Sequence, residues 1–134
     1  MTDTGNTTER MTVSIVGGSG YTGGELLRLL LDHPGVTVQA VTSRANAGEP
    51  LHRKHPNLRG RSDLLFTAPD ELEKCDVVFL CMPHGRAAKE IDRYNELGDL
   101  IVDLSADFRL RDAETYKQWY REDHPAPHRL ADVA

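Results

Sequence analysis

The feature that most constrains this chain is a run of glycines between a β-rich segment and an amphipathic one. Residues 17–23 read GGSGYTG, which contains G-x-G-x-x-G from Gly18 and G-x-x-G-x-x-G from Gly17. Glycines in such a turn permit positive φ, let the backbone approach a pyrophosphate, and allow the following helix to pack close to the strand. The pattern alone is weak, because glycine-rich turns also serve purely structural purposes.

The flanking residues supply the context that the motif needs. Residues 11–16 (MTVSIV) predict a strand, and residues 36–42 (VTVQAVT) predict another. Between them, leucines recur one turn apart from Thr22 until His33-Pro34-Gly35, which predicts an amphipathic helix. Strand, turn, helix and strand within about 30 residues have the size of a βαβ unit. This context predicts a dinucleotide phosphate site formed by Gly17, Gly18, Ser19, Gly20, Tyr21, Thr22 and Gly23.

Further strands and helices alternate along the rest of the chain. Residues 76–82 (DVVFLCM) and 100–104 (LIVDL) predict buried parallel strands, separated by a helix that Gly98 ends. Residues 64–67 suggest a short strand, and residues 43–61 a long, mostly exposed loop with a binding task. Asp112 opens a last short helix, in which three aromatic residues share a face: Tyr116, Trp119 and Tyr120. The alternation predicts an α/β fold of the Rossmann type, with a doubly wound parallel sheet.

The end of the second strand indicates which dinucleotide binds. An NAD site usually places Asp or Glu there, about 20 residues after the glycines, to bind the ribose hydroxyls. Here the strand ends in Ser43, Arg44 and Ala45, with no acidic residue before Glu49. Arg44 can form charge-assisted bonds to a 2′-phosphate, and Ser43 can donate another. These residues favour NADP, the alternative being that Arg44 is an ordinary solvated loop residue.

Other candidates follow the two later strands. Pro83 and His84 come at a carboxyl end where α/β proteins place ligands, so His84 either lines a nicotinamide pocket or simply starts the next helix. Ser105 and Arg109 reach the same edge, where Arg109 suits a phosphate or carboxylate of a substrate. A structural ion pair of Arg109 with a neighbouring aspartate is equally compatible with the sequence.

Composition excludes several classes of function. The net charge of −5 is spread along the chain without a basic block, which argues against a nucleic-acid partner. No apolar run approaches the roughly 20 residues that span a bilayer. The polar residues 1–10 predict a disordered tail rather than a secretory signal. Cys75 and Cys81 lie on one strand and cannot form a disulfide with each other, so we expect the protein in a reducing cytoplasm. Cys81 lies within an apolar run, which favours a packing role over a nucleophilic one.

Four segments together resemble the N-acetyl-γ-glutamyl-phosphate reductases and the similar reductases acting on carrier-protein-bound aminoadipyl or glutamyl phosphate in lysine and arginine synthesis. They are GGSGYTGGELLRLL, the Ser43-Arg44 pair, DVVFLCMPHG and DLSADFRL. The resemblance runs from Met11 to the chain end. It implies that residues 19–22 bind the NADP pyrophosphate, that residues 43–45 lie near its 2′-phosphate, and that Ser105 and Arg109 face the substrate, with Arg109 near the acyl phosphate.

The resemblance also implies what this chain lacks. In that family a cysteine in a Pro-Gly-Cys segment attacks the acyl phosphate, and NADPH then reduces the thioester. No Pro-Gly-Cys segment occurs here, and family members are more than twice as long. We therefore expect residues 11–134 to be an incomplete NADP-binding domain, cut off before the catalytic domain and inactive alone, with an exposed sheet edge prone to self-association. The full-length form is expected to be a homo-oligomer. The alternatives are a non-catalytic NADP-binding module and a reductase like aspartate-semialdehyde dehydrogenase.

Overall fold

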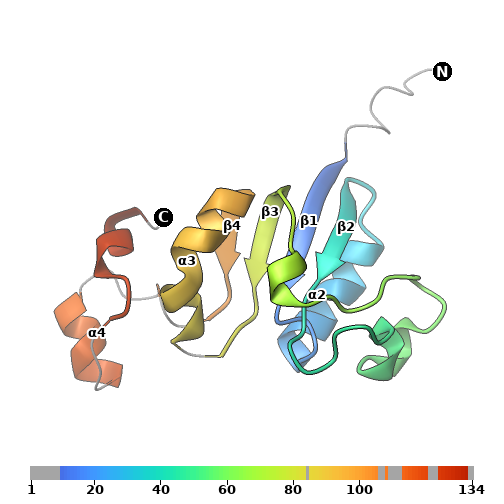
Figure 1. The fold of residues 1–134 in the computed structure, drawn as a ribbon, viewed down its shortest axis with the longest axis horizontal. Helices are drawn as coiled ribbons and strands as arrows, with labels where there is room; N and C mark the ends of the chain where they lie inside the picture. The colour runs from blue at the N-terminus through green and yellow to red at the C-terminus, as the bar shows by residue number, and fades with distance from the viewer. Residues whose placement is uncertain (1–9, 84, 106–107, 109–112, 121–123, 133–134) are drawn as a thin grey trace.

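A four-stranded parallel sheet forms the centre of the protein (Figure 1). The computed structural model describes residues 10–83, 85–105, 108, 113–120 and 124–132. The sheet has the order β2-β1-β3-β4, and its strands are β1 (Met11–Val16), β2 (Val36–Val41), β3 (Cys75–Leu80) and β4 (Gly98–Asp103). Because the chain adds β2 on one side of β1 and β3 on the other, the strand order reverses at the carboxyl ends of β1 and β3. Open α/β sheets bind ligands at such a switch point.

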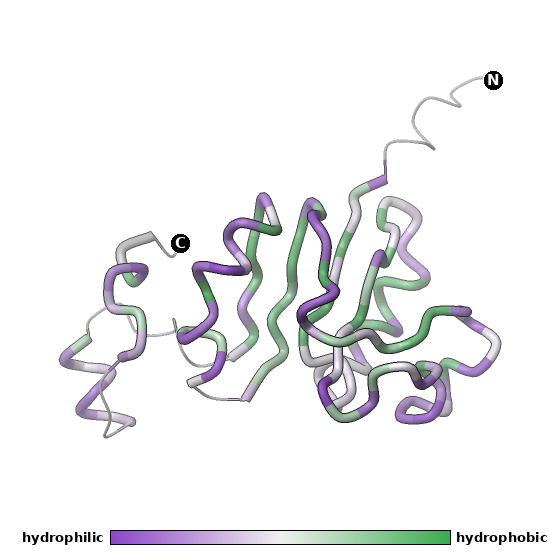
Figure 2. Tube along the Cα trace, viewed as in Figure 1, coloured by the Kyte–Doolittle hydropathy of each residue, from purple (hydrophilic) through white to green (hydrophobic). Residues whose placement is uncertain are grey.

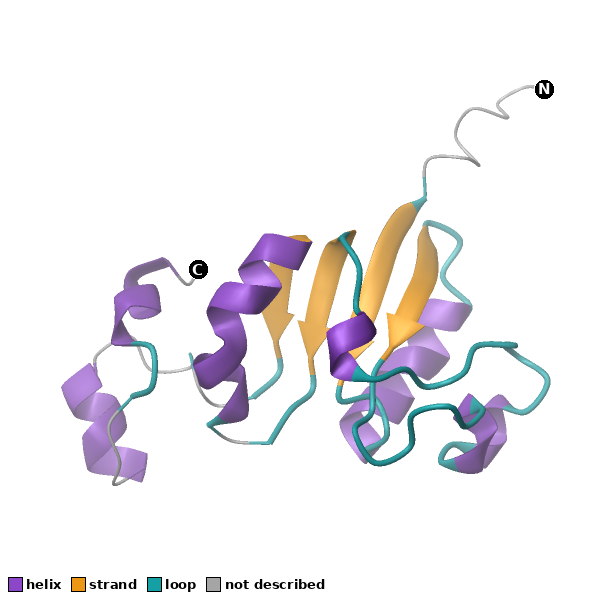
Figure 3. Ribbon diagram, in the orientation of Figure 1, coloured by secondary structure: helices purple, strands orange, loops and turns teal. Residues whose placement is uncertain are grey.

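Helices cover both faces of this sheet, as the alternating pattern predicted (Figure 3). Helix α2 (Tyr21–Leu31) packs Leu27 against Ile15 and Val41 on one face. Helix α3 (Arg86–Leu97) packs Ile91 among the buried residues of the other face. The α/β, doubly wound architecture of the Rossmann type is therefore confirmed.

The elements around β1 follow the hydrophobic pattern closely. Helix α2 begins at Tyr21, one residue before the predicted start, and ends before His33. Leu27 has no exposed surface. The hydropathy trace shows apolar strands between helices that alternate polar and apolar stretches (Figure 2). Gly98 caps the end of α3 as predicted, although with extended backbone rather than a left-handed turn.

The later strands correct two predictions. Strand β4 is not buried: Leu100 is 56% exposed and Leu104, just past its end, 41% exposed. Helix α2 lies behind β1 and β2, at the other end of the sheet from β4. Among the described elements, no helix therefore covers β4 on the face that α2 covers at β1 and β2 (Figure 1). Residues 64–67 form two isolated bridges, Thr42 with Thr67 and Pro50 with Leu65, rather than a strand.

The segment of residues 43–61 is more than a surface loop. Many of its residues are exposed, but it forms two short 3₁₀ helices, η1 (Leu51–Arg53) and η2 (Pro56–Leu58). Leu51 and Leu58 insert into the core beneath α2. The segment is thereby anchored against the glycine turn that begins α2.

The last described elements, α4 (Ala113–Tyr120) and η4 (Pro127–Asp132), lie beyond β4 (Figure 1). Tyr116 is fully buried and its ring meets that of His124 at 4.6 Å between centroids, whereas Trp119 is 72% exposed, so the predicted aromatic face is only partly buried. The predicted helix start at Asp112 lies outside the described residues. Within the described part of the chain, no helix combines the length and apolar character that crossing a membrane requires.

Candidate functional site

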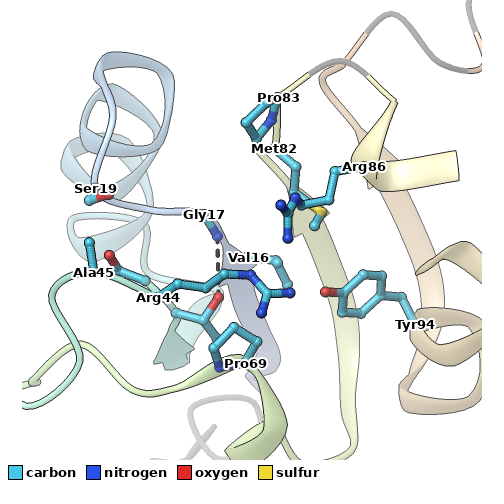
Figure 4. Close-up of a pocket in the computed structure, with 12 residues that line it drawn as sticks. Val16, Gly17, Ser19, Arg44, Ala45, Pro69, Met82, Pro83, Arg86 and Tyr94 are labelled. Atoms are coloured by element: carbon cyan, nitrogen blue, oxygen red, sulfur yellow. Dashed lines mark hydrogen bonds between the residues drawn. The ribbon is translucent and has the colours of Figure 1, made fainter. Parts of the chain in front are cut away.

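A cavity of about 270 Å³ opens at the switch point of the sheet (Figure 4). The ends of β1, β2 and β3 and one face of α3 line it, so four elements that are distant in sequence meet there. The lining residues are Val16, Gly17, Ser19, Thr42, Ser43, Arg44, Ala45, Pro69, Met82, Pro83, Arg86 and Tyr94. Six of the predicted cofactor residues therefore line one cavity: Gly17, Ser19, Ser43, Arg44, Ala45 and Pro83. None of the described lining residues is acidic.

The glycines of the turn have different physical roles. Gly17 has φ +78°, and a Cβ there would lie 2.7 Å from the carbonyl oxygen of Cys81. A Cβ on Gly18 would meet Val41 at 2.2 Å, and one on Gly23 would meet the Gly18 backbone at 2.6 Å. These three positions need glycine for close packing. Gly20 differs, because nothing lies within 4 Å of its would-be Cβ.

The start of α2 offers unsatisfied backbone donors at the same place. Gly20 is the N-cap and no side chain caps the helix, while Tyr21 is 99% exposed. The N–H groups of a helix's first turn and its dipole favour an anion. On the strand side, the Gly17 N–H donates to Thr42 Oγ1 at 3.2 Å and the Gly18 N–H to the Thr42 carbonyl at 2.9 Å. An uncapped helix start beside an open glycine and a cavity fits the diphosphate of a dinucleotide.

A buried histidine fixes the back of this turn. Its Nε2 lies 2.7 Å from the carbonyl oxygen of Gly18 and, since a carbonyl only accepts, Nε2–H of His55 is the donor. The His55 ring also lies against Gly24, where a Cβ would come within 2.5 Å of it. His55 is only 8% exposed. Sequence reasoning missed this residue, since a histidine in a glycine- and proline-rich segment gives no periodic signal.

The predicted 2′-phosphate residues have distinct environments. Ser43 is buried, and its Oγ accepts bonds from Asn46 N–H at 3.2 Å and Asn46 Nδ2 at 3.0 Å. Arg44 is exposed and extends across the cavity toward α3, where its guanidinium lies 3.4 Å from Glu90 Oε2 (Figure 4). Ala45 lines the cavity beside them. Arg44 therefore carries a positive charge to the cavity, and its role at a 2′-phosphate stays a prediction.

Helix α3 adds three residues that sequence reasoning did not assign to the site. Arg86, Glu90 and Tyr94 recur every four residues and so share one face. The Tyr94 hydroxyl donates to Glu90 Oε1 at 2.9 Å, and Arg86 Nη1 lies 3.8 Å from Glu90 Oε2. Burial, with the bond to Glu90, raises the pKa of Tyr94 to about 12, so its hydroxyl stays a donor at neutral pH. Their spacing of four residues in the sequence could have predicted that these three side chains share one face of the helix.

Three further predicted site residues, His84, Ser105 and Arg109, follow β3 and β4. His84 and Arg109 lie outside the described residues. Ser105 follows β4, where its N–H and hydroxyl both donate to Asp103, at 2.8 and 3.0 Å. This arrangement is a tight turn stabilised by Asp103, and the substrate role of Ser105 stays a prediction.

Neither cysteine has the environment of a nucleophile. Burial, together with the negative charge of Asp103, raises the pKa of the Cys81 thiol to about 11. Cys75 is buried, and its thiol donates to the carbonyl of Val77 at 3.4 Å. A thiolate is the reactive form, so the raised pKa keeps Cys81 unreactive at neutral pH, and burial removes Cys75 from contact with a substrate. The interpretation of Cys81 as a packing residue agrees with this pKa.

Comparison with known proteins gives a family match over nearly the whole chain. The family described as "Semialdehyde dehydrogenase, NAD binding domain" matches residues 12–132. The match indicates a nicotinamide dinucleotide as the cofactor. In structure, the chain is similar to an aspartate semialdehyde dehydrogenase with NADP from Candida albicans, with a TM-score of 0.59 and 21% identity over 77% of this chain and 32% of that one. At that identity the likeness shows the fold alone.

Two curated relatives are much more similar in sequence. The (LysW)-L-2-aminoadipate 6-phosphate reductase of Deinococcus radiodurans is 54% identical over 92% of this chain. The N-acetyl-gamma-glutamyl-phosphate reductase of Nitrosococcus oceani is 49% identical over 90% of it. The chain spans 35% and 36% of the lengths of these relatives. The resemblance to this group of reductases is thus confirmed for the matched part.

Proposed function

The chain belongs to the semialdehyde dehydrogenase family through its NAD-binding domain, and on this premise we propose that it binds NADP for the reduction of an acyl phosphate to a semialdehyde. The substrate class follows the names of the relatives: an N-acetylglutamyl phosphate, or an aminoadipyl or glutamyl phosphate held on a carrier protein. Arginine or lysine biosynthesis is the corresponding role.

The observation that carries the choice of NADP is the position of Arg44. Its guanidinium enters a cavity whose described lining contains a second arginine and no carboxylate. A 2′-phosphate forms strong, often bidentate bonds with such groups, whereas a ribose diol needs an acidic acceptor. Residues 43–45 accordingly hold the 2′-phosphate in this proposal.

The other residues divide the remaining work. Residues 17–23 hold the pyrophosphate through backbone N–H groups at the start of α2, and His55 keeps that turn in place. Pro83 and His84 are assigned to the nicotinamide side, and Ser105 and Arg109 to the substrate. The bound cofactor supplies the hydride.

The chain's own cysteines do not supply the family's nucleophile. Cys81 has its pKa raised to about 11, and Cys75 is buried. We therefore assign cofactor binding to this chain and expect no acyl-phosphate reduction from it alone.

The experiment is a titration of the chain with NADPH and with NADH, followed by calorimetry. We expect tighter binding of NADPH, and Arg44→Asp should weaken it about 10- to 150-fold, the equivalent of a charged hydrogen bond of roughly 1.5–3 kcal/mol. Arg59→Asp is the matched control, because Arg59 is exposed and does not line the cavity. Equal affinity for the two cofactors, or an equal loss in both variants, would contradict the proposal.

A further inference from the structure

We propose that Glu90 on α3 sets how strongly the cavity discriminates between phosphorylated and unphosphorylated adenosine ribose, by competing with the 2′-phosphate for Arg44 and Arg86. The inference rests on the proposed NADP function. It extends that function to a helix whose sequence carries no dinucleotide motif.

The carboxylate is held in a defined orientation. Its Oε1 accepts the Tyr94 hydroxyl at 2.9 Å. Its Oε2 faces the guanidinium groups of Arg44 at 3.4 Å and Arg86 at 3.8 Å. One carboxylate oxygen thus accepts from a buried tyrosine, and the other lies between two guanidinium groups. Figure 4 shows Arg44, Arg86 and Tyr94 at the cavity.

The two ion pairs are weak enough to be exchanged. Both separations are long, and the side chains of Arg44 and Arg86 are 58% and 46% exposed, against 23% for Glu90. Exposed pairs of this kind contribute little, because water screens them and both side chains lose freedom. A phosphate offers each arginine shorter, charge-assisted bonds. The arginines are therefore collected at the site but remain available to a ligand.

Glu90 nevertheless opposes the phosphorylated ligand in two ways. Each arginine must leave the carboxylate to bind the phosphate, and the phosphate then lies near a like charge. An unphosphorylated ribose brings no phosphate to compete for the arginines, and the carboxylate does not line the cavity, so Glu90 does not oppose binding of that ligand. Removing its charge shifts selectivity toward the phosphorylated ligand on both counts.

The test compares Glu90→Gln with the wild type, using adenosine 2′,5′-bisphosphate and 5′-AMP as probes. Gln is isosteric and retains an oxygen for Tyr94, so the fold should survive. We expect binding of the bisphosphate to tighten about two- to fivefold, the size of one weak exposed ion pair. Binding of 5′-AMP should stay unchanged. Glu96→Gln, an exposed glutamate later in the same helix, is the control and should change neither.

Thermal unfolding of both variants verifies that the fold is intact. If the wild type binds the bisphosphate and folded Glu90→Gln binds it no more tightly, the competition is overturned while the proposed function stands. If Glu96→Gln tightens binding as much, a general charge effect replaces the specific one. If the wild type binds neither probe, the NADP proposal falls and this inference with it.

Discussion

The contact between Gly24 and His55 allows a test of how the glycine turn before α2 is held in place. Gly24 lies inside α2, where glycine ordinarily costs about 1 kcal/mol relative to alanine. Gly24→Ala should therefore stabilise the helix. In this fold, however, the added Cβ would come within 2.5 Å of Cε1 and Nδ1 of the His55 ring.

The ring has little freedom to move away. His55 is 8% exposed, donates to the Gly18 carbonyl at 2.7 Å, and meets Phe66 edge-on at 6.2 Å between centroids. Overpacking costs roughly 1–3 kcal/mol. Releasing the ring leaves a buried carbonyl unsatisfied, at a similar cost of about 1–3 kcal/mol. Either route offsets or exceeds the gain in helix propensity of about 1 kcal/mol, so Gly24→Ala should destabilise the protein by up to about 2 kcal/mol.

A double-mutant cycle isolates this contact. In a His55→Ala background the clash is gone, and Gly24→Ala should stabilise by about 1 kcal/mol, which gives a coupling of roughly 1–3 kcal/mol. Urea unfolding of the four proteins, followed by circular dichroism, measures the free energies. His52→Ala is the control background, in which Gly24→Ala should remain destabilising. Stabilisation by Gly24→Ala in the wild type, or equal effects in both histidine backgrounds, would refute the reasoning.

Two further predictions concern the turn and the thiol. Gly20→Ala should change the free energy of unfolding by less than about 1 kcal/mol, because its Cβ meets no protein atom within 4 Å, but the Cβ should weaken NADPH binding. Gly18→Ala, whose Cβ would lie 2.2 Å from Val41, should destabilise the protein by about 1–3 kcal/mol. Unfolding and NADPH titration of both variants test this, and undiminished NADPH affinity in Gly20→Ala would contradict it. In a Cys75→Ala background, the alkylation rate of Cys81 should still rise about tenfold per pH unit between pH 8 and 10. The reason is that burial raises the pKa of the Cys81 thiol to about 11, and the thiolate is the reacting form. A rate that levels off near pH 9 would contradict the raised pKa.

The sequence predicted best what depends on residues close together in the chain. The change from alternating to helical period located β1, α2 and β2, and the glycine run located the turn between β1 and α2. Strand β4 was misjudged because its letters, LIVDL, describe an apolar strand but not what covers it. Exposure of Leu100 depends on the position of α2, which lies behind β1 and β2.

The candidate site shows the same limit at the level of single side chains. Arg44 was predicted to face a phosphate, and its position at the cavity follows from the end of β2. Its partner Glu90 lies on a helix that enters the site only through the fold. His55 likewise contacts a residue that is far from it in the sequence, Gly18, and no local pattern distinguishes His55 from the exposed histidines.

The strand order explains why a cation and its competitor meet at this cavity. The chain leaves β2, crosses over β1 and returns on its other side as β3, so the end of β2 and the start of α3 flank the same switch point. A residue following β2 can therefore bind a ligand's phosphate while a residue on α3 opposes it. In our proposal, cofactor preference then depends on two opposing contributions: attraction of the phosphate by Arg44 after β2, and repulsion of it by Glu90 on α3. Either element can alter that preference without changing the glycine turn, to which we assign the pyrophosphate.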